Sequence, residues 1–204
     1  MEGEFYMAIV TKTIGELKGY KFFVPSYQRG YRWTEHEVKA LLEDIYEFST
    51  ENGKQYCIQP IIVRERNDGS FEVVDGQQRL TTIYIFMKIA EEKTEYVPFD
   101  IEFETRKSSQ NFLSGLTSKG IINNENIDYF HITTARETIN KWLESQNNTY
   151  IAINDIFKRL IESVFFIWNE IPSESDTIDI FTKVNLGKIP LTNAELIKAL
   201  LLNE

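Results

Sequence analysis

The sequence predicts an α+β fold, in which a small mixed sheet with helices is followed by a mainly helical second half. Two observations indicate this fold class. Short apolar or alternating runs, typical of strands, gather between residues 57 and 104. Further along, apolar residues recur mostly at the spacing of helices, and only the run 164–168 is strand-like. We therefore expect two regions: 1–105 carries the sheet, and 106–204 is mainly helical and completes the functional site.

The elements of the first region follow from a helix cap, a turn and apolar periodicity. Thr34 and Glu37 have the spacing of a capping box, in which each side chain bonds the backbone of the other residue. The Asn-Asp-Gly-Ser turn at 67–70 separates two apolar runs and so predicts a β-hairpin. In chain order we expect an extended segment from residue 20, a helix at 35–50, strands at 57–64 and 71–74, a buried helix at 80–90, and a strand at 99–104.

The second region is expected to hold several helices and one strand. Thr192 and Glu195 form another capping box, which predicts the start of the last helix. That helix is still apolar at 200–202, where the sequence stops, so we expect a piece cut from a longer protein. A C-terminal helix docked on the core is the alternative. The expected helices cover 107–116, 126–146, 153–163, 174–184 and 192–203, with the strand at 164–168 between them.

The composition is typical of a soluble protein, and the charge restricts its partners. With 22 Lys and Arg against 31 Asp and Glu, the formal net charge is −9, which disfavours non-specific DNA binding. No apolar run approaches the roughly 20 residues that span a bilayer. The acidic N-terminus lacks signal-peptide features, so we expect a cytoplasmic protein that is not bound to a membrane. The single Cys57 lies in an apolar run and predicts a buried structural thiol.

The loop Asp-Gly-Gln-Gln-Arg at 75–79 joins the second hairpin strand to the buried helix. The first N–H groups of a helix have no partner within the helix and carry the positive end of its dipole, so they suit an anion. Arg79 adds a guanidinium that can grip phosphate oxygens in two places. Asp75 could hold Mg²⁺ or orient a water, and Thr81 and Thr82 supply hydroxyls one turn along. The structural alternative is an ordinary turn in which Arg79 pairs with Asp75.

A second cluster interleaves arginine with aromatic side chains in nine residues, 25–33. Its members are Arg29 and Arg32 with Tyr27, Tyr31 and Trp33. An arginine can hold a phosphate while a neighbouring ring stacks on a base. The alternative is an aromatic anchor that packs the following helix. Because an acidic chain concentrates arginine here and at Arg79, we expect the two clusters to form one shared anion pocket.

Together these clusters resemble a known family, the GmrS-like domain that opens many modification-dependent restriction and phage-defence proteins. The resemblance rests on three blocks in order: residues 25–33 followed by Asp44-Ile45, residues 74–82, and residues 181–192 leading to 195–199. Two positions depart from the family pattern. Gln59-Pro60 stands where a Leu-Gly pair is frequent, and Asn185-Leu186-Gly187 is one residue tighter than the commoner Asn-x-x-Gly spacing.

The resemblance implies a ParB/sulfiredoxin-like fold followed by helices, with binding and hydrolysis of nucleoside triphosphates through the loop 75–79. It also implies a partner, a His-Asn-His nuclease domain, fused or separate, that cuts modified DNA. Two isolated histidines, His36 and His131, cannot build that nuclease, so the chain is expected to be the sensing or regulatory half.

On this hypothesis the domain hydrolyses a nucleoside triphosphate with Mg²⁺. The expected catalytic residues are Asp75 for magnesium or water, Gln78 for the attacking water and Arg79 for phosphate. The expected binding residues are Tyr27, Gln28, Arg29, Trp33, Gly76, Gln77, Thr81, Thr82 and Asn185. Two alternatives stay open: a non-enzymatic module that recognises modified DNA, and a scaffold that docks a nuclease.

Overall fold

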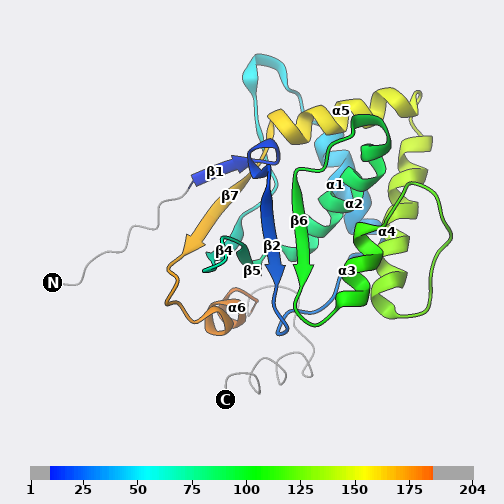
Figure 1. Cartoon of the computed structure of the whole chain (residues 1–204). Helices are drawn as coiled ribbons and strands as arrows, with labels where there is room; N and C mark the ends of the chain where they lie inside the picture. The colour runs from blue at the N-terminus through cyan, green and yellow to red at the C-terminus, as the bar shows by residue number, and fades with distance from the viewer. Residues whose placement is uncertain (1–9, 186–204) are drawn as a thin grey trace.

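One curled mixed sheet forms the centre of the molecule, and helices pack against it (Figure 1). The computed structural model describes residues 10–185, so the helix expected at 192–203 lies outside the described residues. The strands are β1 (Val10–Thr13), β2 (Tyr20–Val24), β3 (Tyr56–Cys57), β4 (Ile61–Glu65), β5 (Phe71–Asp75), β6 (Phe99–Phe103) and β7 (Val164–Ile171). The helices are α1 (Glu35–Glu47), α2 (Gln77–Thr94), α3 (Lys107–Ser114), α4 (Ile127–Glu144), α5 (Thr149–Glu162) and α6 (Thr177–Asn185).

The sheet joins strands from both halves of the sequence, in the order β1-β7-β4-β5-β2-β6. Strand β7 pairs antiparallel with β1 and parallel with β4, and the short β3 also pairs with it. The expectation of a mainly helical second half is therefore corrected, since helices and strands interleave. Alternate residues of β7, among them Val164, Phe166 and Trp168, are buried, and the strand continues to Ile171. The division of the chain at residue 105 stays a prediction.

The predicted β-hairpin is confirmed, but its first strand is interrupted. Strands β4 and β5 pair antiparallel around the turn at 67–70. The single strand expected at 57–64 is instead divided into β3 and β4. Gln59 has a left-handed backbone with φ of 76°, and Pro60 has no N–H to donate, so strand pairing is interrupted between β3 and β4. Cys57, expected to be buried, is only half-buried beside this bend.

The predicted capping box at the start of α1 is also confirmed. The Glu37 carboxylate accepts hydrogen bonds from the Thr34 backbone N–H at 2.8 Å and from the Thr34 hydroxyl at 2.6 Å. The helix ends at Glu47, three residues earlier than expected, because Phe48 adopts an extended backbone with φ of −65° and ψ of 140°. Its buried side chains recur at helical spacing: Val38, Leu41, Leu42 and Ile45.

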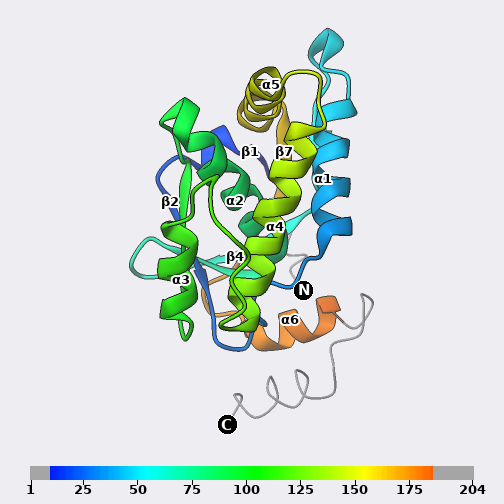
Figure 2. The ribbon, with the colours of Figure 1, turned by 90° about the vertical axis from the view of Figure 1, so that its right-hand side faces the viewer.

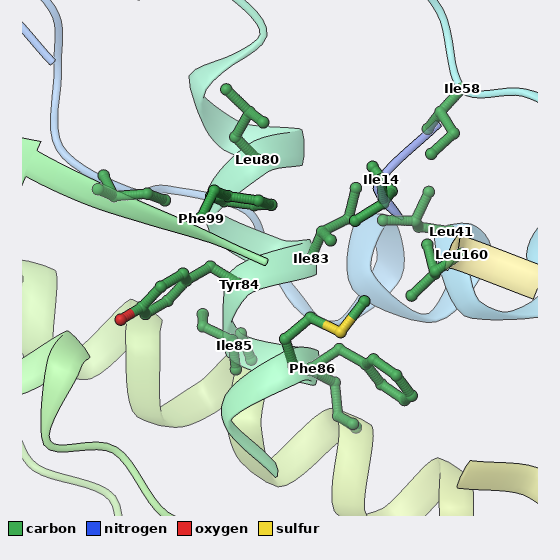
Figure 3. Close-up of a cluster of buried hydrophobic side chains, with 14 of the residues drawn as sticks. Ile14, Leu41, Ile58, Leu80, Ile83, Tyr84, Ile85, Phe86, Phe99 and Leu160 are labelled. Carbon is green, nitrogen blue, oxygen red and sulfur yellow. The ribbon is translucent and has the colours of Figure 1, made fainter. Parts of the chain in front are cut away.

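The main core lies between the sheet and the helices α1, α2, α4 and α5. Helix α2 is apolar almost all round, as expected, and it extends over 77–94 instead of 80–90. Figure 3 shows its side chains meeting Phe99 of β6, Leu41 of α1 and Leu160 of α5. Figure 2 shows α4 running past both α1 and α2, with which it packs. None of the helices within 10–185 is both long and apolar enough to span a bilayer.

The opposite face of the sheet carries a smaller core under α6. Successive side chains of a strand point to opposite faces, so Val73 joins the main core and Val74 points away from it. Val74 packs there with Tyr27, Ile171 and Phe181 of α6. The end of β5 therefore lies between α2 on one face and α6 on the other.

Candidate functional site

A tight turn connects β5 to α2 at the centre of the site. Asp75 is the last residue of β5 and Gln77 the first of α2, so Gly76 alone forms the connection. The predicted loop 75–79 is thus shorter than expected, and most of it is the first turn of the helix. Gly76 has φ of 100°, and a Cβ there would lie 2.5 Å from Cγ2 of the buried Ile61. Both features require glycine at this position.

The two sequence clusters line one pocket at this turn, as expected. Its lining comprises Gln28, Arg29, Trp33, Asp75, Gly76, Gln77, Gln78, Arg79, Phe181 and Asn185. The volume is about 160 Å³. Sites that enclose a whole small molecule measure roughly 300–1,000 Å³. The enclosed part of this pocket therefore suits a group the size of a phosphate.

Arg29 is a cation of this pocket that has no partner among the described residues. Its side chain is half-buried, and within residues 10–185 it makes no hydrogen bond or ion pair. Two other arginines near the pocket are paired: Arg32 lies 2.6 Å from Asp128, and Arg79 lies 3.5 Å from Asp75. Partly burying an unpaired charge is unfavourable. An anion in the pocket would supply the missing partner.

Gln77, which also lines the pocket, has an unpaired side-chain donor. The residue is 4% exposed, and its Nε2 is buried without a hydrogen-bond partner. Its Oε1 accepts from Nε2 of Gln78 at 2.8 Å, which fixes the amide orientation. The first helical bond of α2 runs from the Leu80 N–H to the Gly76 carbonyl at 3.0 Å. The backbone N–H groups of 77–79 therefore have no partner within the helix and carry its positive end.

Arg79 fixes the bend at 58–60 to the start of α2. Its Nη1 donates to Oε1 of Gln59 at 2.8 Å, and its Nη2 donates to the Pro60 carbonyl. The ion pair with Asp75 that was the structural alternative is present. Burial lowers the pKa of Arg79, and the Asp75 carboxylate opposes this shift.

Gln78 and Gln28 hold the arginine-aromatic segment against β5 and α2. Gln78 Oε1 accepts from the Arg32 backbone N–H at 2.8 Å, and its Nε2 donates to the Gly30 carbonyl at 3.1 Å. The second hydrogen of Nε2 is used by Gln77, so both amide donors of Gln78 are engaged. Gln28 Nε2 donates to the Val74 carbonyl at 3.1 Å. These bonds give Gln78 a positioning role.

The positioning role of Gln78 predicts a loss of stability in the ligand-free protein. Gln78→Ala leaves the Arg32 N–H and the Gly30 carbonyl without their partner, at a cost of about 2 kcal/mol. We expect a melting temperature lower by about 4–8 °C. Gln55→Ala, at an exposed position, is the control. Equal melting temperatures for both variants would contradict this role and favour the expected function of orienting water.

Comparison with known protein families agrees with the resemblance noted for residues 25–33, 74–82 and 181–192. Residues 11–202 match the family described as GmrSD restriction endonuclease, N-terminal domain. The chain belongs to this family. It is thus an N-terminal domain of a GmrSD-type modification-dependent restriction endonuclease, a family that pairs this domain with a nuclease. No curated protein matches the chain.

Three residues expected to bind nucleotide lie outside the pocket lining of this GmrSD N-terminal domain. Tyr27 is buried, its hydroxyl donates to Oε1 of Glu72 at 2.9 Å, and burial raises its pKa. The Thr82 hydroxyl donates to the Gln78 carbonyl at 2.9 Å. The Thr81 hydroxyl is buried without a partner. By contrast, Asn185 does line the pocket, and its Nδ2 donates to the carbonyl of the α6 residue Phe181 at 2.7 Å.

Sequence reasoning missed Asp128, a buried carboxylate that fixes the segment carrying Arg29. Its Oδ1 lies 2.6 Å from Nη1 of Arg32, and its Oδ2 accepts from the Ser109 hydroxyl at 3.1 Å. A Cβ on Gly30 would lie 2.1 Å from Oδ1, so only glycine leaves room for this contact. Asp128 is one of 31 acidic residues and 96 positions from Arg32, and nothing in its local sequence marks it.

Proposed function

We propose that this GmrSD N-terminal domain binds a nucleoside triphosphate and holds its terminal phosphates in the pocket at the start of α2. The observation that carries the proposal is Arg29, a half-buried guanidinium that faces the pocket without a partner in the described part of the chain. Among the described residues, two arginines and one carboxylate line the pocket, although the whole chain has a net charge of −9. The pocket is thus locally basic in an acidic protein.

Each unpaired donor has a defined part in this proposal. Arg29 would grip phosphate oxygens with its planar fork, which matches their geometry. Gln77 Nε2 and the N–H groups at the start of α2 would donate to the same phosphate. Arg79 would add charge from the side while it continues to hold the bend at 58–60.

Hydrolysis is the second part of the proposal. A water would attack the terminal phosphorus, and the bond to the bridging oxygen would break with the diphosphate as leaving group. Asp75 is the one carboxylate among the described residues that line the pocket, so it would orient the water or a magnesium ion. Within 10–185, no three His, Cys, Asp or Glu side chains gather to hold a metal. A single carboxylate fits Mg²⁺, which commonly binds through one or two carboxylates, phosphate oxygens and waters.

The proposed role in the whole system is regulatory. The mixed sheet would be of the ParB/sulfiredoxin-like type, and the occupied pocket would change how the domain engages a His-Asn-His nuclease. The nuclease cuts modified DNA in this proposal, so recognition of the modification belongs to the assembled protein.

Thermal unfolding with ATP, GTP, CTP and UTP, each with and without Mg²⁺, tests binding. A ligand at about 100 times its Kd stabilises the folded state by about 2.7 kcal/mol. For a domain of this size, that free energy corresponds to an increase in melting temperature of roughly 5–10 °C. Magnesium-dependent release of inorganic phosphate in the same samples tests hydrolysis.

The outcomes of this experiment separate the proposal from its alternatives. No shift with any of the four nucleotides would contradict the proposal and favour a docking scaffold. A shift with modified duplex DNA in the absence of nucleotide would favour direct recognition of DNA. Such binding should weaken as the salt concentration rises.

A further inference from the structure

A second pocket lies directly beside the first. It measures about 220 Å³ and runs between α1 and the segment 56–59. Trp33 and Arg79 line both pockets, so they form the boundary between them. Any molecule that extends from the first pocket past this boundary reaches the second one.

The walls of the second pocket are aromatic, apolar and acidic. Trp33 is half-buried and forms one side, and the buried side chains of Leu41 and Ile58 also line it. Tyr56 stacks on Phe48 with ring centroids 5.5 Å apart and an interplanar angle of 27°, which fixes the ring. A half-buried indole beside apolar side chains is a surface on which a flat ring can stack.

Asp44 gives this pocket a fixed hydrogen-bond acceptor. The Tyr56 hydroxyl donates to its Oδ2 at 2.9 Å, and burial, together with this contact, raises the pKa of Tyr56 to about 12. Among residues 10–185 that bond is the one that the Asp44 side chain makes, so Oδ1 keeps its accepting capacity. An ionised carboxylate only accepts hydrogen bonds, so it selects ligand groups that donate. Glu37 also lines the pocket, and two carboxylates repel a phosphate.

The two neighbouring pockets therefore differ in the chemistry that they accept. The first offers guanidinium and N–H donors to an anion, and the second offers an aromatic wall and a carboxylate acceptor to a neutral, ring-containing group that donates hydrogen bonds. A ribonucleoside has both features, because its base stacks and its ribose hydroxyls donate.

We infer that the second pocket holds the nucleoside of the triphosphate, with the base against Trp33 and the ribose 2′-hydroxyl donating to Asp44. This inference rests on the proposed function, since it requires the phosphates to occupy the first pocket. Arg79 lies where the two parts of the ligand meet. The inference adds a substrate class: a ribonucleotide is bound in preference to inorganic polyphosphate and to the 2′-deoxynucleotide.

Calorimetric titration of the whole chain compares ATP, GTP, CTP, UTP and inorganic tripolyphosphate. We expect at least one nucleotide to bind about tenfold tighter than tripolyphosphate, as stacking of one base provides. If tripolyphosphate binds as tightly as all four nucleotides, the assignment of the nucleoside to the second pocket is overturned, and the proposed phosphate site in the first pocket is retained. If neither tripolyphosphate nor any nucleotide binds, the proposed function fails and this inference fails with it.

A substitution that fills the second pocket gives a direct test. Ala40 lines it from the exposed surface of α1, so Ala40→Trp should block it without disturbing the core. We expect nucleotide affinity to fall about tenfold while tripolyphosphate affinity is unchanged. Lys39→Trp, one residue away and outside the lining, is the matched control. Unchanged nucleotide affinity in Ala40→Trp would overturn the inference.

Asp44→Asn tests the acceptor itself. Asparagine can still accept from the Tyr56 hydroxyl, but it presents an amide donor where the carboxylate oxygen was. We expect the preference for the ribonucleotide over the 2′-deoxynucleotide to shrink about tenfold, since a hydrogen bond to a charged group is lost. Retained tripolyphosphate binding confirms that the variant is folded. An unchanged preference in the folded variant would overturn the role of Asp44.

Discussion

Gly76→Ala is expected to destabilise the protein by about 3 kcal/mol or more, the largest effect of any substitution at the site. A backbone with φ of 100° is strained for an L side chain, at about 1–3 kcal/mol. In addition, the new Cβ would lie 2.5 Å from Cγ2 of Ile61, which is fully buried and cannot move aside freely. Overpacking of this kind adds about 1–3 kcal/mol. Chemical denaturation of the ligand-free protein measures the sum.

Gly69→Ala separates the two contributions to this loss. Gly69 has a similar φ of 76° in the turn between β4 and β5, but a Cβ there has no neighbouring atom within 4 Å. We expect it to lose only the backbone contribution, about 1–2 kcal/mol. If the two variants are equally stable, the clash with Ile61 is relieved by a shift of β4, and the tight turn is less constrained than its geometry indicates.

Arg29→Gln is expected to abolish most nucleotide binding while leaving stability unchanged. The glutamine keeps a polar side chain but removes the charge that faces the pocket, and no hydrogen bond or ion pair with another residue in 10–185 is lost. A hydrogen bond to a charged group contributes about 1.5–3 kcal/mol, so the Kd should rise at least about tenfold. The measurements are calorimetric titration with the nucleotide that gives the largest thermal shift, and denaturation without ligand.

Arg66→Gln is the control for net charge. Arg66 lies in the turn after β4, and its replacement changes the charge of the chain by the same amount. It should leave the Kd within about twofold at physiological salt, since charges beyond the screening length of about 8 Å interact weakly. An equal loss of affinity in both variants would show that the overall charge matters and that Arg29 has no specific contact with phosphate.

Local sequence signals predicted the elements that depend on local contacts. The capping box of Thr34 and Glu37 placed the start of α1, and the turn at 67–70 placed the hairpin. The end of α1 was missed because it depends on the backbone angles of Phe48. The break at 59–60 was missed although Pro60 is a local signal for it, since a proline cannot donate to a sheet. Strand β7 was recognised as a strand, yet its place between β1 and β4 depends on pairing with residues more than 100 positions away.

Part of the pocket lining was predictable from the sequence, and the contacts of each residue were less so. Arg29 and residues 75–79 were expected to share one pocket, and they line one, while Tyr27, Thr81 and Thr82 lie outside its lining. The engagement of Gln78 with the backbone of Gly30 and Arg32 has no local signature, because it joins segments that are 46 or more residues apart. The contact of Asp128 with Arg32 also has no local signature, because the two residues are 96 positions apart.

The place of β7 in the sheet sets the order in which the domain can fold. Its Trp168 pairs with Val10 on one side and with Ile61 on the other, so the sheet is incomplete until residues 164–171 have left the ribosome. Until then β1 and β4 have unpaired edges that are open to wrong partners. Contacts this distant in sequence also make folding slow, because a long loop must close before they form. The pocket beside β4 and β5 can therefore form only late in synthesis, so any function that depends on it is delayed until most of the domain has been made.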